Sequence, residues 1–209
     1  MWSRVKLPPQ FQLVSQLWGI TYPFRPEILS VLEDIAKFSS YISNAALQSS
    51  GSIYKNFEFS FQNLIPLLHR LLDLSVARID MDHVGNMMQE AVRLGCLLYM
   101  AGIKRIFGFI SRTPKTISHK IYVVLQRGVE DWAGFEILYL WCLAMGAMES
   151  FGEDKRWFLS TLKNELNAHG RATLEEGLDV LRSFIWFEEA HTPLYLQTVR
   201  SISRSGEDV

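Results

Sequence analysis

The sequence predicts an all-α fold, an irregular bundle of about seven or eight helices with two central buried helices. Three observations support this prediction. No proline occurs between Pro114 and Pro193, so long helices can form there. No Asn-Gly or Asp-Gly dipeptide, the strongest short-range signal of a β-hairpin, is present. Apolar residues recur at spacings of three and four, which is typical of helices.

The composition is that of a globular chain. Its 209 residues are enough to bury a large core without metal or disulfide staples. The net charge of −1 gives no electrostatic attraction to nucleic acid or acidic lipid. Cys96 and Cys142 each lie inside an apolar run and are interpreted as small buried hydrophobes. This cysteine usage is typical of a protein inside the cell.

Residues 1–60 are predicted to form an N-terminal strap, short helices and a mobile loop. Pro26 suits the first position of a helix that runs through Phe38. Ser39 to Ser60, rich in Ser, Asn and Gly, is predicted to be a weaker helix followed by a mobile loop. The apolar residues near the N-terminus are expected to lie as an irregular strap over the helices: Trp2, Val5, Leu7, Phe11, Leu13, Leu17 and Trp18.

Residues 61–200 are predicted to form the helical core. A single apolar stripe with spacings of three and four runs from Phe61 to Ile79. Asp82 is predicted to cap a helix that continues through Ile106. From Leu94 onward the other faces of this helix become apolar too, so it is expected to enter the core.

The next two helices also have sequence signals. Thr113 and Pro114 form an N-cap and first-position pair. Ile121 to Leu125, which follows, is β-branched enough to be a short strand instead. Phe135 to Met148 is apolar on every side, which predicts the second central helix, ended by Gly152.

The last helix is predicted from a capping box. Thr173 to Glu176 has the Thr-x-x-Glu pattern that satisfies the first amide groups of a helix, and this helix is expected to continue through Glu189. The polar residues 201–209 are expected to be a flexible tail.

The two buried helices are expected to touch through small residues. Gly95 and Gly102 lie seven residues apart, on the same helix face two turns on. Ala144, Gly146 and Ala147 give the other helix a small surface. Since missing side chains let helix backbones approach closely, these glycines are predicted to serve helix packing.

Catalytic or metal chemistry is not predicted. Glu188 and His191 form the one pair with metal-ligand spacing, but di-iron bundles need two such pairs and two more glutamates. His191 precedes Thr192 and Pro193, where the helix is expected to stop, so it is interpreted as a histidine at a helix end that interacts with the helix dipole. The sequence has no nucleophile elbow, no phosphate-binding glycine loop and no cysteine near a histidine. No catalytic, cofactor-binding or metal-binding residue is assigned.

Arg93, Glu149 and Glu188 are candidates for a buried ion pair. Glu149 ends a buried helix where the dipole disfavours a negative charge, so Arg93 or Arg156 is expected nearby. Glu188 shares an apolar stripe and is expected to be half-buried and paired with a cation.

Neither nucleic acid nor a membrane is predicted as a partner. The basic residues are spread out, which indicates a solvated helix face. Trp141, Trp157 and Trp186 fall within apolar patterns and are expected to pack in the core. The longest uncharged apolar stretches are well short of the ~20 residues that span a bilayer.

Several segments together resemble the regulatory domain of fungal-specific transcription factors. They are Gln89 to Tyr99, Trp141 to Glu149 closed by Gly152, Arg156 to Phe158, and Leu181 to Glu188. Their order and spacing are similar to the C-terminal half of that domain. The resemblance covers residues 61 to 199.

The resemblance implies a nuclear, non-catalytic regulatory domain that acts through protein partners or a small effector. No zinc cluster can be built from Cys96 and Cys142, so this chain is not expected to recognise DNA. Only about sixty residues precede the match, so an apolar patch and self-association as a dimer are expected. The alternatives are a small all-α enzyme of an unrecognised family and a helical protein-interaction module.

Overall fold

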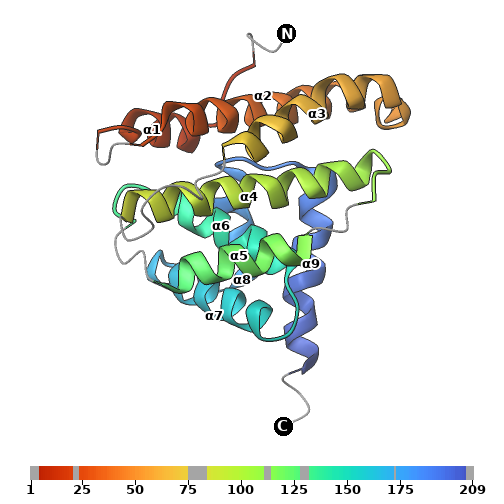
Figure 1. The fold of residues 1–209 in the computed structure, drawn as a ribbon. Coiled ribbons are helices and arrows are strands. Elements are labelled where there is room, and N and C mark those ends of the chain that lie inside the picture. Colours follow the sequence, from red (N-terminus) through yellow and green to blue (C-terminus); the bar gives the residue numbers. More distant parts are fainter. Residues whose placement is uncertain are drawn as a thin grey trace.

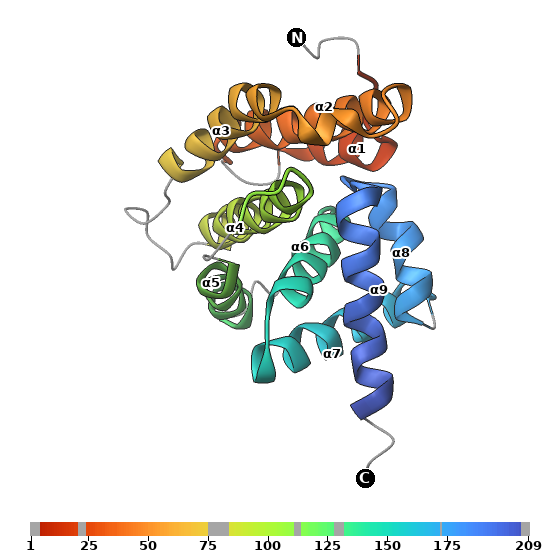
Figure 2. The ribbon, with the colours of Figure 1, turned by 90° about the vertical axis from the view of Figure 1, so that its right-hand side faces the viewer.

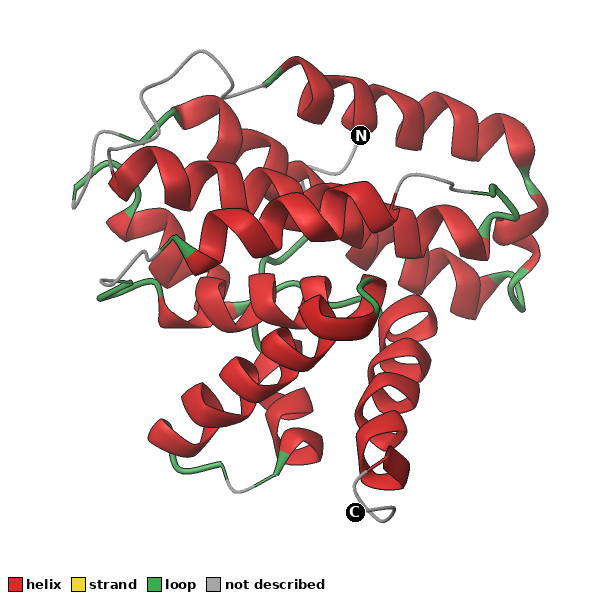
Figure 3. Ribbon diagram, turned by 60° about the horizontal axis from the view of Figure 1, so that its bottom comes forward, coloured by secondary structure: helices red, strands yellow, loops and turns green. Residues whose placement is uncertain are grey.

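The computed structural model describes residues 5–20, 24–74, 84–110, 114–127, 132–171 and 173–205. Over these ranges the chain is helical and contains no strand, which confirms the all-α prediction (Figure 3). The helices are α1 (Pro9–Leu17), α2 (Pro26–Gln48), η1 (Ser52–Lys55, a 3₁₀ helix), α3 (Phe57–Asp73), α4 (Val84–Ile106), α5 (Pro114–Gln126), α6 (Glu136–Glu149), α7 (Gly152–Ala168), α8 (Leu174–Arg182) and α9 (Glu188–Ser205).

The helices are arranged around α4. Helices α1, α2 and α3 form a layer on one side of α4, while α5 to α9 lie on the other side (Figures 1 and 2). Helix α6 has buried residues all round, as expected of a central helix. One hydrophobic core includes side chains from every helix from α1 to α9. The boundary expected after residue 60, between the N-terminal region and the helical core, falls inside α3. The hydrophobic core includes side chains from both sides of this boundary.

The first helices are longer or more regular than the sequence predicted. Helix α2 starts at Pro26 as predicted but continues ten residues beyond Phe38, because Ser39, Ile42 and Ala46 keep its buried stripe intact. The predicted irregular strap is helix α1 over Pro9–Leu17, while Trp2 lies outside the described residues. The mobility expected before Ser60 stays a prediction.

Helix α3 begins four residues before the predicted start. The Asn56 side chain accepts a hydrogen bond from the backbone N–H of Phe59 (2.9 Å), an N-cap that satisfies one otherwise free amide. Ile79 and Asp82, predicted to end α3 and to cap α4, lie outside the described residues.

Helix α4 ends in a Schellman motif. Gly108 has a φ of 78°, which favours glycine. The N–H of Gly108 donates to Arg105 O (3.0 Å), and the N–H of Phe109 donates to Lys104 O (2.9 Å). This turn places the Phe109 ring 5.6 Å from that of Phe57, measured between centroids, and the end of α4 and the start of α3 both lie at the right of Figure 1.

The strand alternative for Ile121 to Leu125 is wrong, because these residues lie within α5. Pro114 opens that helix as predicted, and Thr113 lies outside the described residues. Gly152 does not end α6, which stops at Glu149. It is the first residue of α7, with a φ of 58°.

The helix predicted from Thr173 through Glu189 is two helices. The Thr173 capping box is present. The chain then leaves the helix after Arg182, and α9 begins at Glu188. Phe184, Ile185 and Phe187, in the segment between these two helices, are all buried.

The predicted tail at residues 201–209 is also corrected in part. Helix α9 continues through Ser205, and residues 206–209 lie outside the described residues. Pro193 does not stop this helix, since it lies in its second turn.

Candidate functional site

The predicted packing glycines each face an aromatic ring, but only one of them joins the two central helices. A Cβ added at Gly95 would lie 2.8 Å from the Trp141 ring of α6. A Cβ at Gly102 would lie 2.7 Å from His191 Nε2 of α9, and one at Gly146 would clash with Phe158 of α7. The prediction that Gly102 and Gly146 join α4 to α6 is therefore wrong, although both are packing glycines.

The three tryptophans differ in burial. Trp141 is fully buried, and its indole N–H donates to the backbone oxygen of Ile185 (2.8 Å). This bond satisfies a carbonyl in the segment between α8 and α9. Trp157 and Trp186 are half-buried and pack against the core from outside.

A buried polar network lies between α2, α4 and α9. The Tyr99 hydroxyl donates to Ser39 Oγ (2.8 Å), and the Ser39 hydroxyl donates to the backbone oxygen of Ile35 (2.8 Å). The Tyr99 ring stacks on the His191 imidazole with 4.2 Å between centroids. This network ties three helices together in the core.

His191 does not act on a helix dipole as predicted, because its side chain is buried in the first turn of α9. It is 1% exposed. Nε2 lies 3.1 Å from Tyr99 O, and Nδ1 lies 3.2 Å from Phe187 O. Burial lowers the pKa of His191 to about 4, so the imidazole is neutral at pH 7. Both nitrogens face backbone oxygens, so the ring serves the structure.

The buried carboxylate of Glu149 is paired with Arg105, not with Arg93 or Arg156 as predicted. Arg105 Nη1 donates to Glu149 Oε2 (2.9 Å), and Nη2 donates to Oε1. Arg93 instead pairs with Glu90 on its own helix, and Arg156 lies 3.7 Å from Glu153. The bidentate pair joins the ends of α4 and α6.

Glu188 is paired with a cation, as predicted. Arg182 donates to both of its carboxylate oxygens, at 2.7 and 2.9 Å. These bonds lower the pKa of Glu188. Its side chain is 53% exposed, so the pair closes the turn between α8 and α9 at the surface and is not a buried pair.

Cys96 and Cys142 are both buried in the core, as predicted. Burial raises the pKa of Cys96 and of Cys142 well above the ordinary thiol value, so neither is a thiolate at pH 7. Among the described residues, no three His, Cys, Asp or Glu side chains come together as a metal site.

The most distinctive surface feature is an exposed aromatic cluster. We call Phe57, Phe61, Phe109 and Ile110 the aromatic surface. Phe57, Phe61 and Ile110 are 66%, 55% and 89% exposed. The Phe57 ring lies 6.1 Å from that of Phe61 and 5.6 Å from that of Phe109, measured between centroids. Large apolar side chains gathered at one exposed place indicate a binding surface.

The aromatic surface rests on an ordered support. Phe59 contacts Phe107 (6.3 Å between centroids), and Phe107 contacts Tyr54 (5.6 Å). Tyr54 reaches Phe187 near the start of α9 (6.4 Å). Sequence reasoning missed this surface. The signal was the Phe-x-Phe-x-Phe run at 57–61, since a helix with a single buried face leaves the aromatic residues of its other face exposed.

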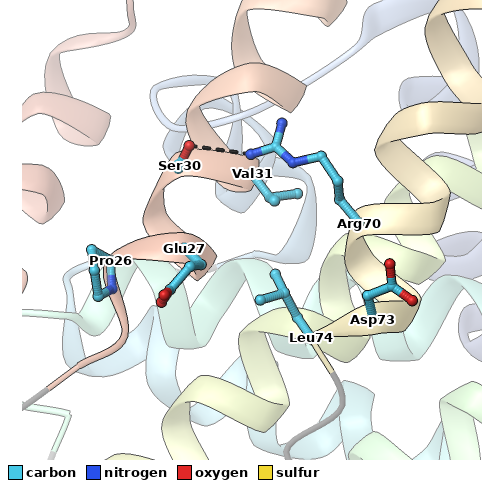
Figure 4. Close-up of a pocket in the computed structure, with 7 residues that line it drawn as sticks. All are labelled: Pro26, Glu27, Ser30, Val31, Arg70, Asp73 and Leu74. Atoms are coloured by element: carbon cyan, nitrogen blue, oxygen red, sulfur yellow. Dashed lines mark hydrogen bonds between the residues drawn. The ribbon is translucent and has the colours of Figure 1, made fainter.

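A pocket of about 430 Å³ lies between the start of α2 and the end of α3 (Figure 4). Val31 and Leu74 are its apolar part. Its charged groups already have partners: Glu27 lies 3.7 Å from Arg25, Asp73 lies 2.8 Å from His69, and Arg70 binds Asp34 and Ser30. Only the contacts of Arg70 join α3 to α2, and each of the three charged side chains that line the pocket is paired within the protein.

Comparisons with protein-family models, with curated proteins and with solved structures found no match to this chain. Within the described residues, none of the helices combines the length and the apolar character needed to cross a membrane.

Proposed function

We propose that this chain is a non-catalytic regulatory domain that acts in the nucleus by binding protein, as its resemblance to the regulatory domain of fungal transcription factors implies. The observation that carries the proposal is the aromatic surface. Its large side chains remain exposed beside a well-filled core, and a protein partner would remove them from water.

A catalytic function has less support. The groups with strongly shifted pKa, such as His191, Tyr99 and Cys96, owe the shift to burial. None of them lines the pocket between α2 and α3. An enzyme needs such groups to meet its substrate, so a binding role fits the described surface better.

We propose that the partner of the aromatic surface is a second copy of this chain. Lys55 and Glu58 carry opposite charges, are both exposed and flank Phe57. In a two-fold dimer each patch meets its own copy, so Lys55 of one copy can face Glu58 of the other. The surface is therefore self-complementary in charge as well as apolar.

A reporter assay tests the regulatory role. The chain is fused to a DNA-binding domain of known specificity, and transcription from its binding sites is measured in a fungal host, with fusion levels checked by immunoblot. We expect the wild-type fusion to change transcription and the double variant Phe57→Ser/Phe61→Ser to lose most of this change. Leu72→Ser is the matched control, because Leu72 is also exposed but lies at the other end of α3.

An unchanged reporter with a stable wild-type fusion would overturn the regulatory proposal. A double variant that acts like the wild type would overturn the role of the aromatic surface. A fluorescent fusion excluded from the nucleus would overturn the proposed location.

A further inference from the structure

Helix α1 covers a cavity. A pocket of about 400 Å³ lies between α1, the start of α6, the end of α7 and α8. The residues of α1 that line it are Gln10, Leu13, Val14 and Leu17. They follow the spacing of one helix face, the α1 stripe, from the buried Val14 to Leu13, which is 52% exposed, so the cavity is open to solvent beside the buried Phe11.

Helix α1 is supported at both ends of this cavity. Near its start, the Phe11 ring stacks on Phe184 with 5.9 Å between centroids. At its end, Leu17 comes so close to Gly134 that a Cβ added there would lie 3.0 Å from Leu17 Cδ1. Gly134 has a φ of 84°, which favours glycine and allows this close approach. These two contacts therefore fix the position of α1 beside the cavity.

The walls of the cavity are apolar. Ile137 and Leu140 of α6 and Val180 of α8 face the α1 stripe. A cavity of this size with apolar walls and a few polar groups is typical of a small-molecule site. No lysine or arginine is among its lining residues, so an anionic ligand would find no counter-charge there.

The polar side chains of the cavity are Glu136, His169, Ser183 and Gln10, whose amide can both donate and accept. His169 Nδ1 lies 2.8 Å from the backbone oxygen of Glu165. The Ser183 hydroxyl donates to Val180 O (2.6 Å), which leaves its oxygen as an acceptor. Glu136 accepts the N–H of Gly134 through Oε1 (2.9 Å) and is an acceptor throughout.

We propose that this cavity binds a small molecule with an apolar body and a primary ammonium group. The apolar body would lie between α1 and α6, where it completes the packing of the α1 stripe. An ammonium group has hydrogen-bond donors and no acceptor, so it can bind the exposed Glu136 carboxylate at the start of α6. The carboxylate of Glu136 supplies the counter-charge.

Three probes with one apolar body and different end groups test this proposal: 2-(1-naphthyl)ethylamine, 2-(1-naphthyl)ethanol and 1-naphthylacetate. Each is titrated into the purified, isotopically labelled chain, and amide shifts are followed by NMR. We expect saturable shifts at the cavity residues, with the amine binding about tenfold more tightly than the carboxylate.

Two variants and a control locate the binding. Glu136→Gln keeps the acceptor for Gly134 and removes the charge, so it should weaken the amine about tenfold and leave the alcohol unchanged. Val180→Phe should fill the cavity and abolish binding of the amine. Glu58→Gln, an exposed carboxylate on α3, should bind the amine as the wild type does.

No saturable shift with any probe at millimolar concentration would overturn the proposal. So would equal affinity for amine and carboxylate, or full amine binding by folded Val180→Phe. The titration uses the purified chain alone, so its result is independent of the reporter assay and of the aromatic surface.

Discussion

At the scale of single residues, buried aromatic rings in the core contact backbone atoms of other elements. His191 stacks on Tyr99, lies beside Gly102 and directs both ring nitrogens to backbone oxygens. Its role depends on long-range contacts, 92 residues apart along the chain in the case of Tyr99. Sequence position could therefore not reveal this role, and Pro193 suggested a histidine at a helix end instead.

The burial of His191 predicts acid sensitivity. Its pKa is about 4 in the folded chain, against 6.5 ordinarily, so the unfolded chain binds more protons between these values. Stability should therefore fall as the pH is lowered from about 6.5 to about 4, and by about 2 kcal/mol between pH 7 and pH 5. Urea unfolding at the two pH values measures this. His191→Phe should flatten the dependence, whereas His69→Gln, at an exposed site, should retain it. The same slope in His191→Phe would refute the assignment.

The contact between Gly102 and His191 predicts a strong coupling between the two positions. Gly102→Ala places a Cβ 2.7 Å from His191 Nε2 and should cost about 1–3 kcal/mol by displacing the imidazole. In a His191→Ala background the same change should be neutral or stabilising, because alanine is the better helix former. Urea unfolding of the four proteins gives the coupling energy. Additive effects would show that the two residues do not touch.

At the scale of helices, the sequence predicted starts better than ends. The Thr173 capping box and the prolines at 26 and 114 are local signals, and each marks a helix start as predicted. The break after Arg182 has no glycine or proline to mark it. It forms because Phe184, Ile185 and Phe187 all find places in the core, which is a tertiary effect that local propensity cannot reveal.

The capping box of α8 predicts a measurable loss of stability. Thr173 Oγ1 accepts the N–H of Glu176 (3.1 Å), and Glu176 Oε2 accepts the N–H of Thr173 (3.3 Å). Thr173→Ala should lower the free energy of unfolding by about 1 kcal/mol. Thr173→Ser should keep most of the stability that Thr173→Ala loses. Chemical denaturation of the three proteins checks this. Equal loss in both variants would mean that the methyl group, not the oxygen, stabilises the helix start.

At the scale of the whole molecule, the apolar pattern predicted a helical core but not its surface. Helices α4 and α6 are central as expected, since their runs are apolar on several faces. The pairing of Arg105 with Glu149 could not be predicted, because it depends on how two helix ends meet. The aromatic surface arises in the same way, from the start of α3 and the turn after α4.

Sedimentation equilibrium of the purified chain tests the central claim. This claim is that the aromatic surface binds protein and that its partner is a second copy of this chain. At tens of micromolar, the wild type and Leu72→Ser should sediment as dimers. Phe57→Ser/Phe61→Ser should sediment as a monomer with an unchanged circular dichroism spectrum, because both side chains are more than half exposed. A monomeric wild type, or a folded double variant that still forms dimers, would contradict the account.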